Sequence, residues 1–356
     1  MAFPRWSPLL VALTLFGASA CNDKPGPGEP AKPDVSAAPA AEVSLKEVDT
    51  TSLTPRERRE WAAQVSELLA PCPDVPVSIA QCVKEKRACK TCLPAAQLLL
   101  KQVQAGRSKK EREEAFQARF DPKKVSPIPT EGSPEKGAPD AVVTIVEWAD
   151  FECSACRVAS PLLDEVVKRF EGQVRLVFKN YPLPIHPHGE LAARAGIAAQ
   201  NQGKFWEMHH IMFENQERLE QADLERYAKQ VGLDAPKYRV DFTAKETTER
   251  IEKDKKQADE LGLDGTPMIF VNGRKVPLES LTNIYEDLEE WVKLDIELAG
   301  KTPRPAPPKG SASPTAAPSA GAVPDAGAPD GGPGAAPTSS PTSAPTADPK
   351  KEPKKK

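Results

Sequence analysis

The chain of 356 residues lacks an excess of charge of either sign, since 48 Lys and Arg stand against 51 Asp and Glu. Its isoelectric point of about 6.0 lies on the mildly acidic side. Proteins that bind nucleic acid through phosphates carry a basic surface, so this balance argues against such a partner. Histidine is scarce, with four residues, and none has metal-ligand spacing shared with a cysteine. We therefore expect neither a nucleic-acid partner nor a cofactor, and we assign no metal ligands.

A long apolar run is also missing from the N-terminal segment. Residues 1–20 hold one basic residue, Arg5, and a short apolar core from Leu9 to Phe16, followed by small residues. A membrane-spanning helix needs roughly 18 to 20 apolar residues, so this core is too short to span. A basic start, a short apolar core and small residues together predict a secretory signal peptide over residues 1–20.

Cys21 follows this segment directly. Ala18-Ser19-Ala20-Cys21 resembles a bacterial lipoprotein processing box, although that box usually has Leu where Ala18 stands. Seven cysteines is an odd number, and lipidation of Cys21 leaves six that can pair in an oxidising compartment. We therefore expect Cys21 to be the lipidated N-terminus. The alternative is ordinary cleavage after Ala20, which leaves Cys21 as a plain thiol.

Composition divides the rest of the chain into four parts. Residues 21–50 are rich in Pro and Ala without apolar periodicity, which predicts a disordered tether. Residues 51–125 form a small cysteine-rich module. Residues 126–300 have the length of one domain and begin with a linker at 126–140. Residues 301–356 are rich in Pro, Ala, Gly and Ser and predict a disordered tail.

The most informative motif is Cys153-Ser154-Ala155-Cys156, which follows an apolar, strand-like run at 141–148 and opens an amphipathic run at 157–170. A helix N-terminus stabilises a thiolate, and such CxxC motifs have thiol pKa values of roughly 3.5 to 7.5. We expect Cys153 to be largely ionised at neutral pH and Cys156 to be the shielded resolving thiol. The motif therefore predicts a redox site. Because no His follows either CxxC, covalent haem attachment is not supported.

The surrounding pattern is that of an α/β domain. Two β-branched runs at 142–148 and 174–179, with a helix between them, predict a parallel βαβ unit. Helical spacing follows over residues 189–263, with helix ends at Gly203 and Gly232. The remaining prediction is a strand at 268–271, an Asn272-Gly273 hairpin turn, a strand at 275–278 and a closing helix at 280–298.

Several motifs together resemble the DsbA-like thiol:disulfide oxidoreductases over residues 128–298. They are Glu147, the CxxC, Phe178-Lys179-Asn180-Tyr181-Pro182, the stretch from Gly203 to His209, Gly265-Thr266-Pro267 and Asn272-Gly273. The resemblance implies a thioredoxin fold with an α-helical insertion, here preceded by a small all-α cysteine-rich module. It also implies thiol-disulfide exchange on secreted proteins and a membrane redox partner that recycles the CxxC.

The resemblance assigns roles to further residues. Thr266 and Pro267 would be a cis-proline loop that faces the CxxC, where an extended substrate can pair with the backbone. Glu147 would be a buried acid that exchanges a proton with Cys156, and Lys179 a buried lysine that could pair with it. The alternative for Glu147 is an acid at a strand end that faces solvent.

The chain departs from the family inside the CxxC. Ser154-Ala155 replaces the Pro-His of the strongest oxidants, so we expect a lower reduction potential and leave the direction of electron flow open. The principal hypothesis is a dithiol oxidoreductase on the periplasmic side of the bacterial cell envelope, held by its lipid. The alternatives are a reductase or isomerase for cytochrome or envelope-protein maturation, and a tethered, chaperone-like binding module.

In the upstream module, Thr54-Pro55 predicts a helix start with Trp61, Val65, Leu68 and Leu69 on one face. A capping box from Ser108 to Glu111 predicts another helix, and a third is expected at 94–105.

The module also holds four cysteines, Cys72, Cys82, Cys89 and Cys92. Two structural disulfides are the simplest prediction, with three possible connectivities. Zinc binding is a second hypothesis, and a redox pair formed by Cys89 and Cys92 that relays electrons to the CxxC is a third. Residues 98–120 faintly resemble the helical hairpin of cytochrome c maturation thiol-reductases, although Val75 stands where that family needs a cysteine.

Overall fold

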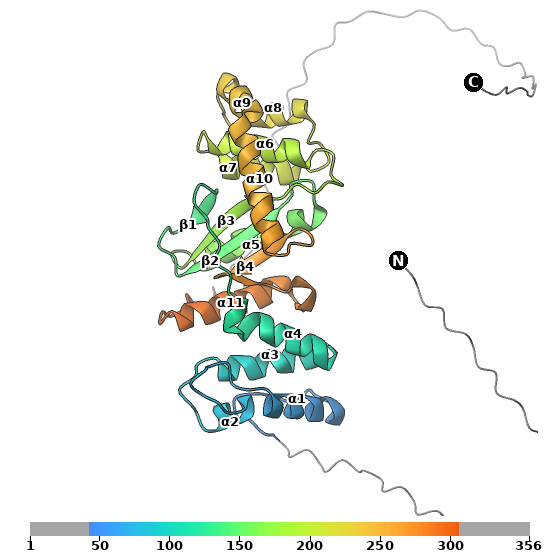
Figure 1. Cartoon of the computed structure of the whole chain (residues 1–356), viewed down its shortest axis with the longest axis vertical. Coiled ribbons are helices and arrows are strands. Elements are labelled where there is room, and N and C mark those ends of the chain that lie inside the picture. Colours follow the sequence, from blue (N-terminus) through green and yellow to red (C-terminus); the bar gives the residue numbers. More distant parts are fainter. Residues whose placement is uncertain (1–42, 306–356) are drawn as a thin grey trace, which may run out of the picture. The chain divides into compact units, whose positions relative to one another are not determined.

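The computed structural model describes residues 43–305. The predicted signal peptide, Cys21, most of the predicted tether and nearly all of the C-terminal tail lie outside the described residues. Within the described part, no helix is both long and apolar enough to cross a membrane. Figure 1 shows the helices of the upstream module followed by a sheet with further helices.

The upstream module consists of four helices. They are α1 (Pro55–Glu67), α2 (Ile79–Lys84), α3 (Cys92–Gln104) and α4 (Lys109–Phe120). Thr54 and Ser108 each form the predicted capping box, with a glutamate at the third helical position. Trp61 and Val65 are fully buried, as predicted. Leu69 is 63% exposed, because α1 ends at Glu67 and Leu69 instead pairs with Ser78 in an isolated β-bridge.

Ordered structure begins earlier than the sequence predicted. Leu45 and Val48 fall inside the predicted tether at 21–50, yet both are buried against Trp61 and its neighbours. The boundary was misplaced because two isolated apolar residues show no periodicity, and only the tertiary contact with the helices explains their burial.

Two disulfides tie this module together, and the structure pairs Cys72 with Cys89 and Cys82 with Cys92. The two cysteines of the Cys89-Lys90-Thr91-Cys92 motif therefore belong to different bridges. This pairing favours structural disulfides over zinc, which binds thiolates, and over a redox pair within that motif.

The second part is built on a five-stranded sheet of order β1-β3-β2-β4-β5. The strands are β1 (Glu135–Gly137), β2 (Val143–Ala149), β3 (Val174–Asn180), β4 (Met268–Val271) and β5 (Arg274–Lys275). Strands β2 and β3 are parallel and joined through α5 (Ser154–Arg169), which confirms the predicted βαβ unit. Strand β1 lies inside the predicted linker, where three residues are too few to show a period.

Helices fill the chain between β3 and β4 and close the domain. They are α6 (Gly189–Gln200), α7 (Phe205–Glu214), α8 (Gln221–Gln230), α9 (Ala235–Thr243), α10 (Lys245–Glu260) and α11 (Ile284–Leu298), with the short 3-10 helix η2 (Leu278–Ser280) before α11. A further 3-10 helix, η1 (Pro122–Lys124), follows α4. Strand β5 ends at Lys275 rather than at residue 278, because Pro277 is the N-cap of η2, which begins at Leu278. Helix α11 starts at Ile284 rather than at residue 280, because Asn283 caps it.

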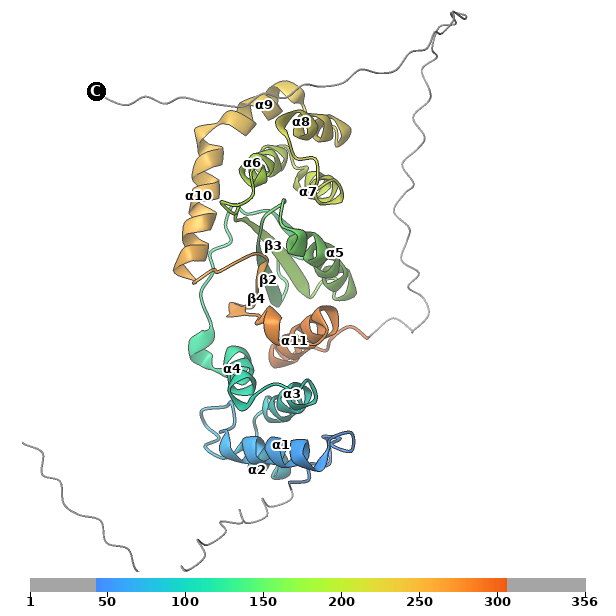
Figure 2. The ribbon, with the colours of Figure 1, turned by 90° about the vertical axis from the view of Figure 1, so that its right-hand side faces the viewer.

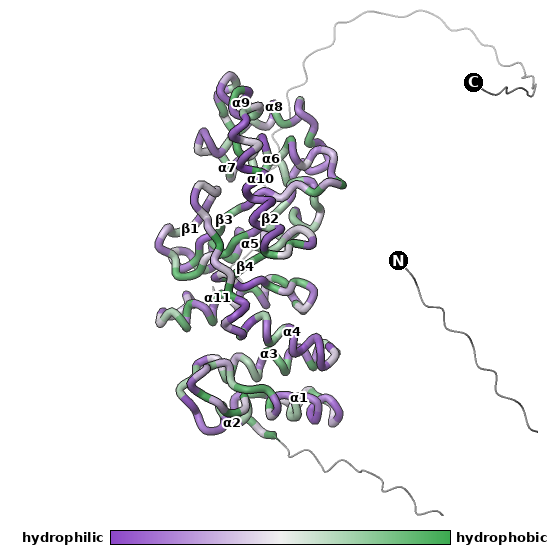
Figure 3. Tube along the Cα trace, viewed as in Figure 1, coloured by the Kyte–Doolittle hydropathy of each residue, from purple (hydrophilic) through white to green (hydrophobic). Residues whose placement is uncertain are grey.

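Helices cover both faces of the sheet, and Figure 2 shows α10 and α5 on opposite sides of the strands. Ile145 of β2 packs with residues of α5 and α11, whereas Val146 and Trp148 pack toward Ala258 of α10. Figure 3 colours much of α10 as hydrophilic, as expected of a helix with one face in solvent. This mixed α/β arrangement with a helical insertion confirms the predicted thioredoxin fold.

Candidate active site

The CxxC lies where β2 passes into α5. Strand β2 ends at Ala149, Cys153 is the N-cap of α5, and Cys156 is the third residue of the helix. Among the described residues these two are the free cysteines. Cys153 keeps 9% of its surface exposed, and Cys156 none. The outer position of Cys153 is the one from which a thiolate can attack a substrate.

The two thiols have opposite electrostatics. The pKa of Cys153 is lowered to about 5, chiefly because the Cys156 side chain donates a hydrogen bond to it, with help from the backbone amides of Ala155 and Cys156. Burial raises the pKa of Cys156 well above its usual range, and its hydrogen bond to Cys153 adds to this. At neutral pH, Cys153 is therefore a thiolate and Cys156 a protonated thiol that stabilises it.

The loop before β4 faces this pair. The Thr266–Pro267 peptide bond is cis, and Cys153 Sγ lies 3.4 Å from the carbonyl oxygen of Thr266. This is the position that the family resemblance implied for the two residues.

A groove opens beside the loop, with a volume of about 580 Å³. Ala155 and Val158 of α5 line one side, and Val158 is 59% exposed. Thr266 and Pro267 also line it, and the carbonyl oxygen of Thr266 lies beside the reactive sulfur. Polar side chains such as Lys275 are among the other lining residues.

Glu147 lies inside the domain. It is 1% exposed, and burial raises its pKa from 4.5 to about 8, with the charge of Asp164 adding to the rise and that of Lys136 opposing it. Its own charge raises the pKa of Cys156, which reflects the closeness of the two groups. Its Oε1 atom has no hydrogen-bond partner within residues 43–305. The solvent-facing alternative for Glu147 is therefore wrong.

Lys179 does not pair with Glu147. Its Nζ lies 3.3 Å from Oδ1 of Asp254 on α10. In the register of β2 and β3, Glu147 is opposite Phe178, whereas Lys179 is opposite Trp148. Neighbouring residues of a strand point to opposite faces, so Lys179 lies on the far side of the sheet from Glu147.

The cation on the face of Glu147 is Lys136 of β1, which forms an ion pair with Asp164 of α5. It is placed there by the register of β1, where Lys136 is opposite Leu176 of β3 and Leu176 in turn is opposite Ile145 of β2. Sequence reasoning missed Lys136, because a three-residue strand gives no periodic signal, and it missed Asp164, because its ion-pair partner lies 28 residues away in the chain.

The four histidines lie outside the CxxC. His209 is buried among aromatic rings and burial lowers its pKa, as expected of a packing residue. His210 contacts Asp164, with Nε2 and Oδ2 2.7 Å apart. His186 and His188 contact Asp150 and Glu152, respectively.

The upstream disulfides lie far from the CxxC. Cys72 lines a surface cavity with Asp295 of α11. Asp295 accepts a hydrogen bond from Asn272 Nδ2, and Asn272 Oδ1 accepts one from the amide of Thr144, which lies near the start of β2. The CxxC follows the other end of β2, and seven residues of strand span about 23 Å. Direct electron transfer between the two sets of cysteines within one chain is therefore not supported.

Comparison with known proteins agrees with this geometry. Residues 130–293 match a family model described as thioredoxin. Over 150 residues the chain is 39% identical to Na(+)/H(+) antiporter NhaA 3 of Salinispora tropica, which covers 42% of this chain and 23% of the antiporter. It is 38% identical over 156 residues to Na(+)/H(+) antiporter NhaA 1 of Mycolicibacterium gilvum, and this match covers 43% of this chain and 25% of the antiporter. The chain thus spans about a quarter of the length of these relatives.

Two of the solved structures that resemble this chain each match about half of it. A thioredoxin-like oxidoreductase from Silicibacter pomeroyi is 31% identical, covers 46% of this chain and 91% of its own, and has a TM-score of 0.42. BdbD from Bacillus subtilis is 24% identical, and the match covers 49% of this chain and 97% of BdbD with a TM-score of 0.43. Residues 130–293 therefore resemble the thioredoxin family, in agreement with the thioredoxin fold and the CxxC at the start of α5.

Proposed function

We propose that this protein exchanges thiols and disulfides with secreted proteins in the bacterial cell envelope. The observation that carries the proposal is the contrast between Cys153, with a pKa of about 5, and the buried Cys156, beside the Thr266–Pro267 loop. A stabilised outer thiolate and a protected inner thiol are what a two-step exchange needs.

The exchange can be written with its electrons balanced. In the oxidising direction, a substrate thiolate attacks Cys153 Sγ of the Cys153–Cys156 disulfide, which forms a mixed disulfide and releases the Cys156 thiolate. A second substrate thiolate then attacks the substrate sulfur of the mixed disulfide. The substrate leaves with its own disulfide, and two electrons remain on the protein as two reduced sulfurs.

In the reducing direction, the Cys153 thiolate attacks a substrate disulfide and releases one substrate thiolate. Cys156 must then lose its proton before its sulfur can attack Cys153. The buried carboxylate of Glu147 is the acceptor we assign to this proton, because its pKa of about 8 suits a group that takes up and returns protons near neutral pH. Attack by Cys156 closes the Cys153–Cys156 disulfide and releases the second substrate thiolate.

The substrates and partners follow from this chemistry. The groove beside Pro267 suits extended protein segments, and a membrane protein that exchanges disulfides would recycle the CxxC. The proposed lipid on Cys21 would keep the enzyme at the membrane. Replacing Cys21 by Ala should then release the protein from membranes and leave its purified activity unchanged, and unaltered membrane fractionation would refute the anchor.

The activity can be tested with two assays, reduction of insulin by dithiothreitol and reoxidation of reduced, unfolded ribonuclease. The wild-type protein should accelerate at least one of them, and a Cys153→Ser variant neither. The reduction potential of the CxxC decides between an oxidase and the alternative of a reductase or isomerase. A protein that binds unfolded chains yet accelerates neither reaction would be a chaperone-like binding module, and the proposed function would be wrong.

A further inference from the structure

One wall of the groove beside the CxxC comes from η2 and the start of α11. Leu278, Glu279 and Ile284 line the groove together with Val158 of α5. Because η2 has three residues, its own hydrogen bonds are few: Ser280 donates to Pro277, and Leu281 donates to Leu278. The carbonyls of Glu279 and Ser280 therefore have no partner within η2 and are open to donors from other segments.

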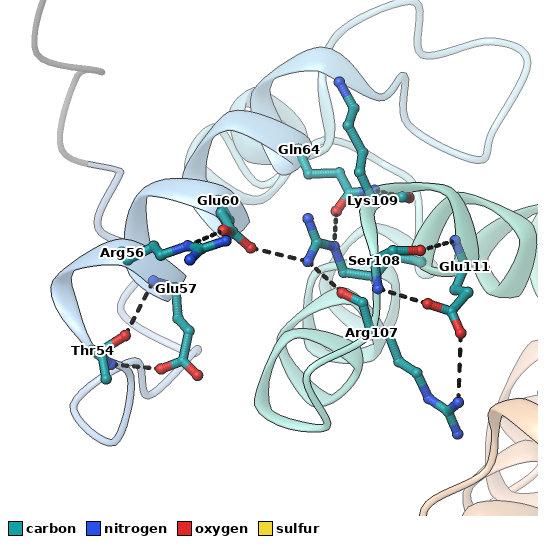
Figure 4. A network of polar contacts seen from close by, with 10 residues as sticks. Thr54, Arg56, Glu57, Glu60, Gln64, Arg107, Ser108, Lys109 and Glu111 are labelled. Carbon is teal, nitrogen blue, oxygen red and sulfur yellow. Dashed lines mark hydrogen bonds and ion pairs between the residues drawn. The ribbon is translucent and has the colours of Figure 1, made fainter.

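The upstream module supplies both donors. Arg107 Nη2 lies 2.6 Å from the carbonyl oxygen of Glu279, and Gln102 Nε2 lies 3.0 Å from that of Ser280. Gln102 belongs to α3 and is 3% exposed, and Arg107 lies in the turn between α3 and α4. Figure 4 shows the Arg107 side chain extending toward the ribbon of the η2–α11 segment.

The start of α11 is held from the same helix. Lys101 of α3 forms an ion pair with Asp287, and Asp287 Oδ2 accepts hydrogen bonds from the amides of Thr282 and Asn283. These contacts fix the first turn of α11, which begins at Ile284. Ile284 lines the groove and is 38% exposed.

The turn that carries Arg107 is itself braced. The buried Arg112 donates from Nη1 to the Arg107 carbonyl oxygen at 2.7 Å and from Nε to Gln64 of α1 at 2.6 Å. Figure 4 shows this network running from α1 to the α3–α4 turn. The position of the groove wall is thus connected through Arg107 to the disulfide-bonded module.

We infer that the upstream helical module is part of the substrate-recognition apparatus: through Arg107 and Gln102 it sets the position of the groove wall formed by η2, and so the affinity for extended protein substrates. The inference rests on the proposed function. Arg107 and Gln102 are positioning residues, since neither touches the reacting sulfurs. Small thiols do not need the groove, so their reaction rates should not depend on the upstream module.

The test compares a large and a small substrate. Arg107→Ala and Gln102→Met each remove one donor to the wall. Gln102→Met also removes an amide oxygen that is buried without a partner, so this variant is expected to fold. Lys110→Ala is the matched control, because it removes a cation from the start of α4 that is 85% exposed and pairs with Glu114 rather than with η2.

With reduced, unfolded ribonuclease as substrate, we expect both variants to raise KM about three- to tenfold, with little change in kcat, as for loss of one hydrogen bond. Their reaction rates with dithiothreitol and the pH midpoint of their Cys153 alkylation should equal those of the wild type. For Lys110→Ala, the KM with ribonuclease should also equal the wild-type value. Unchanged KM in both variants would overturn the inference, and so would an equal loss with dithiothreitol. A wild-type protein inactive with both substrates would instead overturn the proposed function.

Discussion

Cys153 Sγ lies 3.4 Å from the carbonyl oxygen of Thr266, and Cys153 is at the same time the N-cap of α5. The reactive sulfur therefore lies between a helix N-terminus that stabilises its negative charge and a loop whose backbone can receive a substrate. The sulfur that takes part in the exchange thus lies next to the backbone that can pair with a substrate. Because only Cys153 has this position, the two cysteines should differ in reactivity, which experiments can measure.

The first prediction concerns the order of thiol reactivity. At pH 6 iodoacetamide should modify Cys153 much faster than Cys156, and the rate should titrate with a midpoint near pH 5, because the pKa of Cys153 is lowered to about 5. A Cys156→Ser variant should accumulate mixed disulfides with substrates, since the resolving thiol is gone. Faster labelling of Cys156 would reverse the two assignments.

The second prediction concerns Glu147 and pH. Its pKa is raised in the folded protein to about 8 from an unfolded value near 4.5, so the folded state binds the proton more tightly. The stability that this contributes is present in full below pH 4.5, is lost as pH rises toward 8, and amounts to about 1.4 kcal/mol per pKa unit. Glu147→Gln should therefore flatten the decline in unfolding free energy between pH 5 and 8.

The same variant should slow the closing of the Cys153–Cys156 disulfide, because Cys156 loses its proton acceptor. Urea unfolding of the reduced protein at several pH values, together with stopped-flow resolution of a mixed disulfide, measures both effects. A stability profile that keeps its slope in the variant would show that Glu147 does not titrate as described.

The third prediction separates the two lysines. Lys179→Met leaves the buried Asp254 without its cation and should cost about 3 to 5 kcal/mol of stability, while the pH dependence of disulfide closing stays unchanged. Adding Asp254→Leu should recover part of the loss. Lys136→Met removes the charge that lowers the pKa of Glu147 and should shift the midpoint of disulfide closing to higher pH. A shift in the Lys179 variant instead would contradict the assignment of the two lysines to opposite faces.

The fourth prediction concerns the upstream bridges. The Cys72–Cys89 and Cys82–Cys92 bridges join residues 17 and 10 positions apart, so in the chain-entropy view each contributes about 3 kcal/mol. Replacing Cys72 and Cys89 together by Ala should lower the melting temperature of the module and leave the rate with dithiothreitol unchanged. Collapse of that rate in a folded variant would revive the electron-relay hypothesis.

Local features could be predicted from the sequence alone. The capping boxes at Thr54 and Ser108, the βαβ unit and the CxxC at the start of a helix depend on neighbouring residues, so a short stretch of sequence contains the whole signal. The Asn272-Gly273 turn is of the same kind, since both residues adopt positive φ.

What the sequence by itself determined is thus the chemistry of the site, while the tertiary structure decided its electrostatic partners and its surroundings. Lys179 was assigned to Glu147, but the register of β2 and β3 directs it to Asp254 on the other face. The disulfide pairing, the three-residue strand that carries Lys136 and the contact of Arg107 with the groove wall all join segments distant in the chain. Such contacts depend on how whole elements pack, and no local pattern in the sequence encodes them.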